Sequence, residues 1–157
     1  VIHNVGSPGI DYILHANWRR ERPYAEPYVV VSYQAETIEK DFGAGEKIGR
    51  IFADLPAIKR VFIRPNPDRG SDLVNDIING YECVRDTVCD SLPHDEFLNL
   101  LAHCEEFIGN SSAMLYEAPV LGVTVRMIGD RQKGRVIPWG DGKASERIVA
   151  ILKAWRG

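Results

Sequence analysis

The stretch YVVVSY, residues 28–33, is a continuous run of β-branched and aromatic side chains directly after Pro27. Such a run is typical of a strand that is buried on both faces, as the strands of parallel sheets are. Four further strand-like runs occur along the chain. They lie at residues 61–64, 84–88, 106–109 and 123–128.

Segments with helical periodicity separate these runs. In residues 47–55, for example, Ile48, Ile51, Phe52 and Leu55 recur at the spacing of one helix face. Similar segments lie at 71–78, 95–104, 112–121 and 144–155. Strands that alternate with helices predict βαβ units, a parallel sheet and helices on both of its faces. Residues 1–157 therefore predict one α/β domain. In 5–11 (VGSPGID), Pro8 can lie near a helix start, and a linker between domains is also a plausible interpretation.

Composition and charge exclude several classes of function. The net charge of −3 argues against non-specific nucleic-acid binding, which needs a positive surplus. No apolar run approaches the roughly 20 residues that span a bilayer, so we expect no membrane contact. The four histidines lack the spacing of a metal site, and we predict neither metal nor cofactor. The three cysteines are odd in number and form no CxxC, which favours reduced thiols and the cytoplasm.

The segment FIGNSSAMLYEAP, residues 107–119, carries the strongest sign of a binding site. A buried strand ends at Gly109, and Asn110, Ser111 and Ser112 then open a helix. Free N–H groups and the helix dipole attract phosphate at such a point, and the serine hydroxyls add donors. Glu117 lies where a carboxylate accepts both hydroxyls of a ribose. The alternative is a plain helix cap made by Asn110 or Ser111.

Two further loops follow predicted strands at the same edge of the sheet. In GDRQKGR, residues 129–135, Arg131 and Arg135 supply guanidinium groups that bind phosphate in a bidentate manner. A solvated basic loop is the alternative interpretation. In VSYQAET, residues 31–37, Gln34 and Thr37 follow the first strand, where a polar turn before a helix is the alternative. Ligands of open α/β sheets bind at this edge.

The run SLPHDEFLNLLAHCEEFIGNSSAMLYEAPVLGVTVRMIGDRQKGR resembles the C-terminal half of UDP-N-acetylglucosamine 2-epimerases, and is most similar to the hydrolysing branch. VGSPGIDYI and VVSYQAET extend the resemblance over most of the chain. It implies a three-layer Rossmann-like domain, as in the C-terminal half of a glycosyltransferase-B-type fold. It also implies UDP or UDP-N-acetylglucosamine as ligand, with Ser111 and Ser112 on the diphosphate, Glu117 on the ribose, Phe97 against the uracil, and Arg131 or Arg135 closing on the phosphates.

The sequence departs from that family in two ways. Gln34 stands where the family usually has a histidine, and glutamine carries neither a proton nor a positive charge at neutral pH. The family's acid–base carboxylates lie in an N-terminal half that is absent from these 157 residues. We therefore expect a UDP-binding domain that does not catalyse epimerisation alone. We assign no catalytic residue to it. It would pair with a separate N-terminal half or with itself; the alternative is a non-catalytic, self-associating interaction module.

Overall fold

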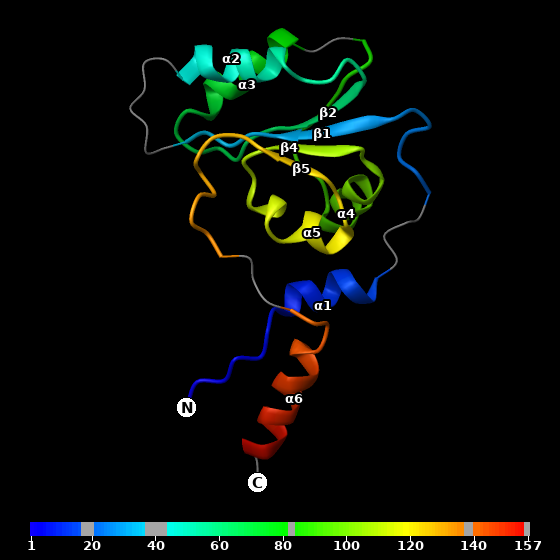
Figure 1. Cartoon of the computed structure of the whole chain (residues 1–157), viewed down its shortest axis with the longest axis vertical. Coiled ribbons are helices and arrows are strands. Elements are labelled where there is room, and N and C mark those ends of the chain that lie inside the picture. Colours follow the sequence, from blue (N-terminus) through cyan, green and yellow to red (C-terminus); the bar gives the residue numbers. More distant parts are fainter. Residues whose placement is uncertain (17–20, 37–43, 82–83, 137–139, 156–157) are drawn as a thin grey trace.

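A computed structural model describes residues 1–16, 21–36, 44–81, 84–136 and 140–155 of the chain. Its centre is a five-stranded sheet in the order β3-β2-β1-β4-β5, in which every neighbouring pair is parallel (Figure 1). The predicted parallel α/β fold is therefore confirmed. The strands are β1 (Tyr28–Ser32), β2 (Lys59–Ile63), β3 (Thr87–Cys89), β4 (Glu106–Gly109) and β5 (Val125–Met127).

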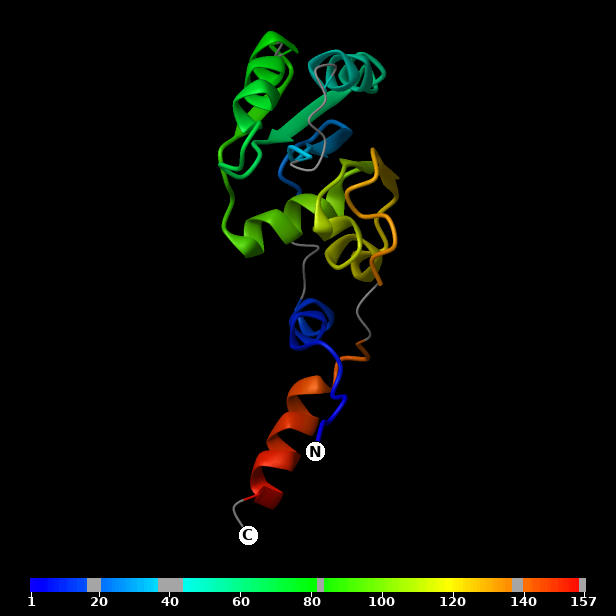
Figure 2. The same ribbon diagram turned by 90° about the vertical axis from the view of Figure 1, so that its left-hand side faces the viewer.

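Helices cover both faces of this sheet and extend beyond one of them. Helices α2 (Ala44–Ala53) and α3 (Ser71–Tyr81) lie on one face, and α4 (His94–His103) and α5 (Glu117–Leu121) lie on the other (Figure 1). Beyond α5 come α1 (Pro8–His15) and then α6 (Ala144–Trp155), which extends away from the sheet in both views (Figure 2). The molecule is thus a three-layer body with a projecting C-terminal helix.

The central strand β1 separates two halves of the hydrophobic core. All five of its residues are buried. Val29 and Val31 pack with Phe52, Phe62 and neighbouring side chains under α2 and α3. Tyr28 and Val30 join the cluster under α4 and α5. Successive side chains of a strand point to opposite faces, so one apolar run fills both layers, as the sequence predicts.

Two predicted strands are shorter in the structure. Of the predicted run 84–88, only residues 87 and 88 belong to a strand, the short β3 at one edge of the sheet; 123–128 contain β5, at the other edge. All three residues of β5 are exposed. An edge strand pairs on one side only, so the apolar pattern of 123–128 overstates the length of the ladder.

The predicted helix over residues 112–121 is divided. Residues Ser112–Met114 form a single 3₁₀ turn, η1, and α5 starts afresh at Glu117. Pro119 explains the break, because proline lacks an N–H and its ring clashes with the carbonyl four residues earlier, here that of Leu115. In the structure Pro119 lies in the first turn of α5, where proline is tolerated.

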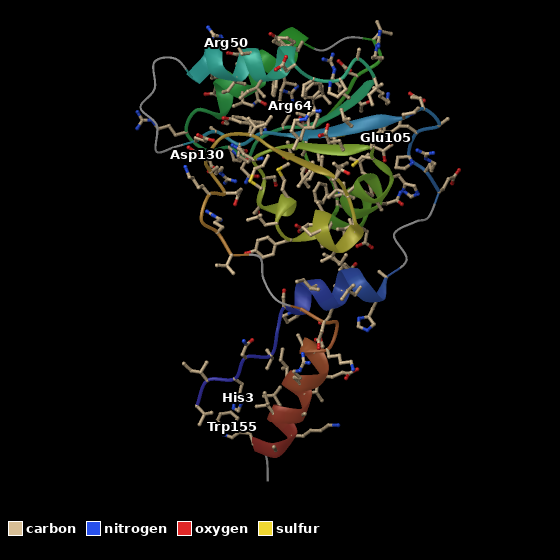
Figure 3. The ribbon with its side chains drawn as sticks, viewed as in Figure 1. His3, Arg50, Arg64, Glu105, Asp130 and Trp155 are labelled. Carbon is tan, nitrogen blue, oxygen red and sulfur yellow. The ribbon has the colours of Figure 1, made fainter. Side chains whose placement is uncertain are left out.

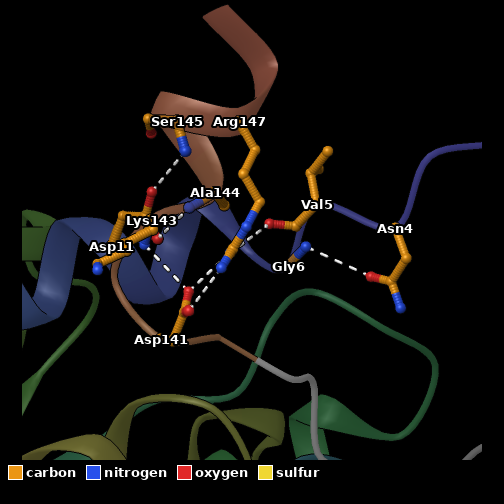
Figure 4. Close-up of polar contacts among 9 residues, drawn as sticks. All are labelled: Asn4, Val5, Gly6, Asp11, Asp141, Lys143, Ala144, Ser145 and Arg147. Carbon is orange, nitrogen blue, oxygen red and sulfur yellow. Dashed lines mark hydrogen bonds and ion pairs between the residues drawn. The ribbon is translucent and has the colours of Figure 1, made fainter. Parts of the chain in front are cut away.

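Within 5–11 a helix, α1, starts at Pro8 as one of the two interpretations predicts, and a polar junction joins it to α6 (Figure 4). The carboxylate of Asp11 accepts hydrogen bonds from the backbone N–H groups of Ala144 (3.1 Å) and Ser145 (2.7 Å). It thereby caps the N-terminus of α6 from another helix. Arg147 donates to both oxygens of Asp141 and to the carbonyl of Val5. These contacts connect the two ends of the described chain.

The two described cysteines behave as structural thiols. Cys89 and Cys104 are free and partly buried, and Cys83 lies outside the described residues. Burial raises the pKa of the Cys104 thiol to about 12, which keeps it protonated and unreactive at neutral pH. Within the described part of the chain, no helix is long and apolar enough to cross a membrane.

Candidate functional site

The strand order places a topological switch point at the carboxyl ends of β1 and β4, and we call the region outside these strand ends the β1/β4 crevice. The chain after β1 leads to α2 on one face of the sheet, and the chain after β4 leads to η1 and α5 on the other. Such a switch point is where open α/β sheets bind ligands. Figure 3 shows Asp130, which follows β5, at this end of the sheet and Glu105, which precedes β4, at the opposite end.

Gln34 and Asn110 are joined by two hydrogen bonds at this crevice. Asn110 accepts from the backbone N–H of Gln34 (2.6 Å) and donates to the Gln34 carbonyl (2.8 Å). Its own N–H donates to the carbonyl of Ser32 (3.2 Å). Asn110 is fully buried, and Gln34 is buried as well. The side chain of Asn110 therefore fixes the loop after β1 relative to the loop after β4.

The side chain of Gln34 is oriented by the loop after β2. Its Oε1 atom accepts from the backbone N–H of Asn66 (2.9 Å), so its carboxamide nitrogen is directed away from Asn66. Gln34 thus presents a neutral donor at the position where the resemblance calls for a histidine. Thr37, the other polar residue predicted in this loop, lies outside the described residues.

The loop after β5 reaches over Asn110. The Asn110 carbonyl accepts from Gln132 Nε2 (2.8 Å) and from Arg131 Nη1 (3.2 Å). Gln132 is 3% exposed, whereas Arg131 is only half-buried. Three loops from three neighbouring strands, β1, β4 and β5, consequently meet around one residue, and a guanidinium group lies among them.

Two glycines permit this close approach. Gly109 has φ +145°, and a Cβ atom there would lie 1.9 Å from the Ser32 carbonyl oxygen of β1. Gly129 has φ +71°, and a Cβ atom there would lie 2.2 Å from Oε1 of Glu36. At Gly109 the obstacle is backbone, so only glycine fits there. At Gly129 the obstacle is the end of a flexible side chain, and the left-handed backbone conformation is what favours glycine.

The two serines follow Asn110 directly. Ser111 is half-buried, and its Oγ accepts from the backbone N–H of Ala113 (3.3 Å), so it caps η1. The helix-cap alternative is thereby present in the geometry, and a serine hydroxyl that accepts one bond still has a proton to donate. Ser112 is exposed. The role of both serines toward phosphate stays a prediction.

Glu117 begins α5 and lies beside His94 of α4. Its Oε1 lies 3.8 Å from Nε2 of His94, at the start of α4. The His94 ring stacks on Tyr12 of α1, with 5.8 Å between ring centroids. The Tyr12 hydroxyl donates to Asp95. Glu117 is thus held beside α1 and α4, further along the chain from the Gln34–Asn110 pair.

The two remaining predicted residues differ in their surroundings. Phe97 is partly buried and packs edge-on against Phe107 of β4, with ring centroids 6.2 Å apart. Arg135 is exposed, and its backbone N–H closes a turn on the Gln132 carbonyl (3.1 Å). The structure therefore joins Gln34, Asn110 and Arg131 by direct contacts, whereas Phe97 and Arg135 have no described contact with them.

Sequence reasoning missed three residues of this site. Gln132 is a neutral residue between two basic ones, which carry the stronger sequence signal, and Asn66 contributes only its backbone. His94 was considered only as a metal ligand. In the described part of the chain, no group of three His, Cys, Asp or Glu side chains could hold a metal ion. A neighbour for Glu117 could have been sought in the polar start of the preceding helix.

Fold and loops together define a doubly wound α/β domain with a polar crevice at its switch point. The family model described as UDP-N-acetylglucosamine 2-epimerase matches residues 1–137, and the chain belongs to this family. The polysialic acid biosynthesis protein P7 of Escherichia coli is 28% identical over 148 residues, which cover 86% of this chain and 37% of that protein.

Two further comparisons extend this result. A GDP/UDP-N,N'-diacetylbacillosamine 2-epimerase (hydrolyzing) of Campylobacter jejuni is 34% identical over 80 residues, covering 48% of this chain and 21% of that protein. The UDP-GlcNAc 2-epimerase of Methanocaldococcus jannaschii, solved with UDP-GlcNAc and UDP, shares the fold with a TM-score of 0.64 at 19% identity. That likeness covers 97% of this chain and 54% of the other. The chain thus spans about half of the solved relative and less of the curated ones.

Proposed function

We propose that this chain is the nucleotide-binding, C-terminal portion of a hydrolysing UDP-N-acetylglucosamine 2-epimerase, and that it binds UDP or a UDP-sugar at the β1/β4 crevice. The observation that carries the proposal is the convergence of three loops on Asn110, with Arg131 among them. Arg131 supplies positive charge next to the serines that follow Asn110. A diphosphate needs such a combination of guanidinium and hydroxyl donors.

In this proposal the residues have separate tasks. Ser111, Ser112 and Arg131 contact the diphosphate, with Arg135 as a second cation. Glu117 accepts the ribose hydroxyls, and Phe97 lies against the uracil. Asn110 shapes the crevice instead of touching the ligand, because its side chain, N–H and carbonyl all have protein partners.

The hydrolysing branch is the finer part of the proposal. The name of the Campylobacter relative includes hydrolysis, and the run at residues 91–135 resembles that branch. The reaction would release N-acetylmannosamine and UDP, in amino-sugar metabolism. We propose that these 157 residues alone do not turn over the substrate. We also propose a cytoplasmic location, which the free thiols of Cys89 and Cys104 support.

Calorimetric titration with UDP tests the proposal. The wild-type chain should bind UDP, and Glu117→Ala should weaken binding about tenfold, because it removes a charge-assisted hydrogen bond to the ribose. Glu105→Ala is the matched control, since it removes an exposed carboxylate at the opposite end of the sheet (Figure 3). Absence of UDP binding by the wild type, or equal affinities of both variants, would refute the assignment.

A second candidate function, self-association, is favoured by the exposed apolar side of α6. Val149, Leu152 and Trp155 are 48%, 53% and 87% exposed, and Figure 3 shows Trp155 near the free end of that helix. Apolar groups gathered on one helix often mark an interface. Light scattering should then show a dimer that Trp155→Glu dissociates. A monomer at every concentration would remove this candidate.

A further inference from the structure

The carbonyl oxygen of Asn110 has two donors of different character. Gln132 Nε2 lies at 2.8 Å and is buried with its whole side chain. Arg131 Nη1 lies at 3.2 Å on a side chain that is only half-buried. A carbonyl oxygen has two lone pairs and accommodates both bonds. The shorter bond comes from the neutral residue and the longer bond from the cation.

This sharing decides what happens when Arg131 leaves the carbonyl. A buried carbonyl without any donor is strongly unfavourable, so an arginine that is the sole partner would be held in place. Gln132 keeps the Asn110 oxygen bonded after Arg131 departs. We propose that Gln132 is a positioning residue that holds the Asn110 carbonyl and thereby frees Arg131 to move onto the diphosphate. This inference rests on the function proposed above.

The other end of the Gln132 carboxamide supports a role in binding over one in folding. Its Oε1 atom is buried without a hydrogen-bond partner. The amide cannot turn to relieve this, because Oε1 would then face the Asn110 oxygen and repel it. A buried acceptor without a donor lowers stability. Methionine, similar in size and without that acceptor, should preserve or improve stability at this position while it impairs binding.

A double-mutant cycle measured by UDP titration tests the proposal. Gln132→Met and Arg131→Met should each weaken UDP binding about tenfold. In the double variant the Gln132 substitution should add less than twofold, because no arginine remains to be freed. The matched control replaces Lys133, an exposed cation of the same loop that pairs with Asp130. Lys133→Met combined with Gln132→Met should show additive effects.

Thermal unfolding of the same variants provides the second readout. Gln132→Met should keep or raise the Tm while it lowers the affinity for UDP. Additive effects in the Arg131 cycle, undiminished binding by Gln132→Met, or a loss of folding in that variant would overturn the proposal. If the wild type fails to bind UDP, both the proposed function and this inference are refuted. Binding by the wild type with an additive cycle refutes the inference alone.

Discussion

The carboxamide of Asn110 hydrogen-bonds both the N–H and the carbonyl of Gln34, 76 residues earlier in the chain, at 2.6 and 2.8 Å. One side chain therefore satisfies two buried backbone groups of another strand's loop. Backbone groups at the end of a strand have no ladder partner, and a side chain that matches both of them replaces the missing ladder. The crevice of the candidate site is built on this pair.

The first prediction concerns stability. Asn110→Ala should destabilise the protein by about 2–4 kcal/mol, because it leaves the two backbone groups of Gln34 buried without partners. Urea denaturation measures this free energy. Asn79→Ala, which removes an exposed side chain bonded to Arg64, should cost less than about 1 kcal/mol. Equal losses in the two variants would show that the pair contributes little.

A second prediction compares two glycines. Gly109→Ala should prevent folding or greatly destabilise the fold, because its Cβ would overlap the Ser32 carbonyl and its φ is +145°. Gly80→Ala, in α3, should stabilise by roughly 0.5–1 kcal/mol, since a Cβ there meets nothing within 4 Å. The melting temperatures of both variants settle the point, and a stable Gly109→Ala would contradict the structure.

The third prediction is a gain of pH dependence. In the wild type, Gln34 is neutral at every pH, so it should contribute no pH dependence to the binding of UDP-N-acetylglucosamine between pH 5.5 and 8. In Gln34→His, the imidazole gains charge as the pH falls through about 6.5 and should strengthen binding to the diphosphate several-fold. Titrations at pH 5.5 and 8 measure the ratio of affinities. If the ratio of affinities is the same in both proteins, the side chain at position 34 does not contact the diphosphate.

A fourth prediction concerns the junction between α1 and α6. Burial acts to raise the pKa of Asp11, but hydrogen bonds from the backbone of Ser145 and Ala144 outweigh it, and the net pKa is lowered. The hydrogen bond from Arg147 lowers the pKa of Asp141 to about 2. A lowered carboxyl pKa stabilises the folded state above the ordinary value and loses this effect as the pH falls through the folded value. The junction should thus persist at neutral pH and weaken from about pH 4 down to about 2.

NMR titration measures this directly at the capped amides. The amide proton shifts of Ala144 and Ser145 should follow the ionisation of Asp11, with a midpoint below its ordinary value of 3.8. Asp11→Asn should remove the titration and reduce the exchange protection of the first turn of α6. A midpoint at or above 3.8 would mean that the carboxylate does not cap the helix in solution.

Much of the fold could be predicted from the sequence because the parallel strands carry a local signal. The run at 28–33 and the strand at 106–109 are apolar on both faces, and both are central in the sheet. Edge strands lack this signal, which is why β3 and β5 were placed too long. The segment 112–121 predicts a continuous helix, whereas Pro119 divides it in the structure.

The site could be predicted only in outline. Motif spacing selected Gln34, Asn110 and Arg131, because each follows a strand at one edge of the sheet. Sequence could not show that Asn110 is enclosed, since its partners lie 76 and 21–22 residues away. The capping of α6 by Asp11, 133 residues distant, was equally invisible to local patterns.

The central claim is that the crevice around Asn110 binds a nucleoside diphosphate. Its most direct test is a map of amide chemical-shift changes on ¹⁵N-labelled protein during titration with UDP. We predict saturable changes at Ser111, Ser112, Glu117 and Arg131, with little change in α3 and α6. Absence of changes at those four residues, or changes confined to α6, would contradict the claim.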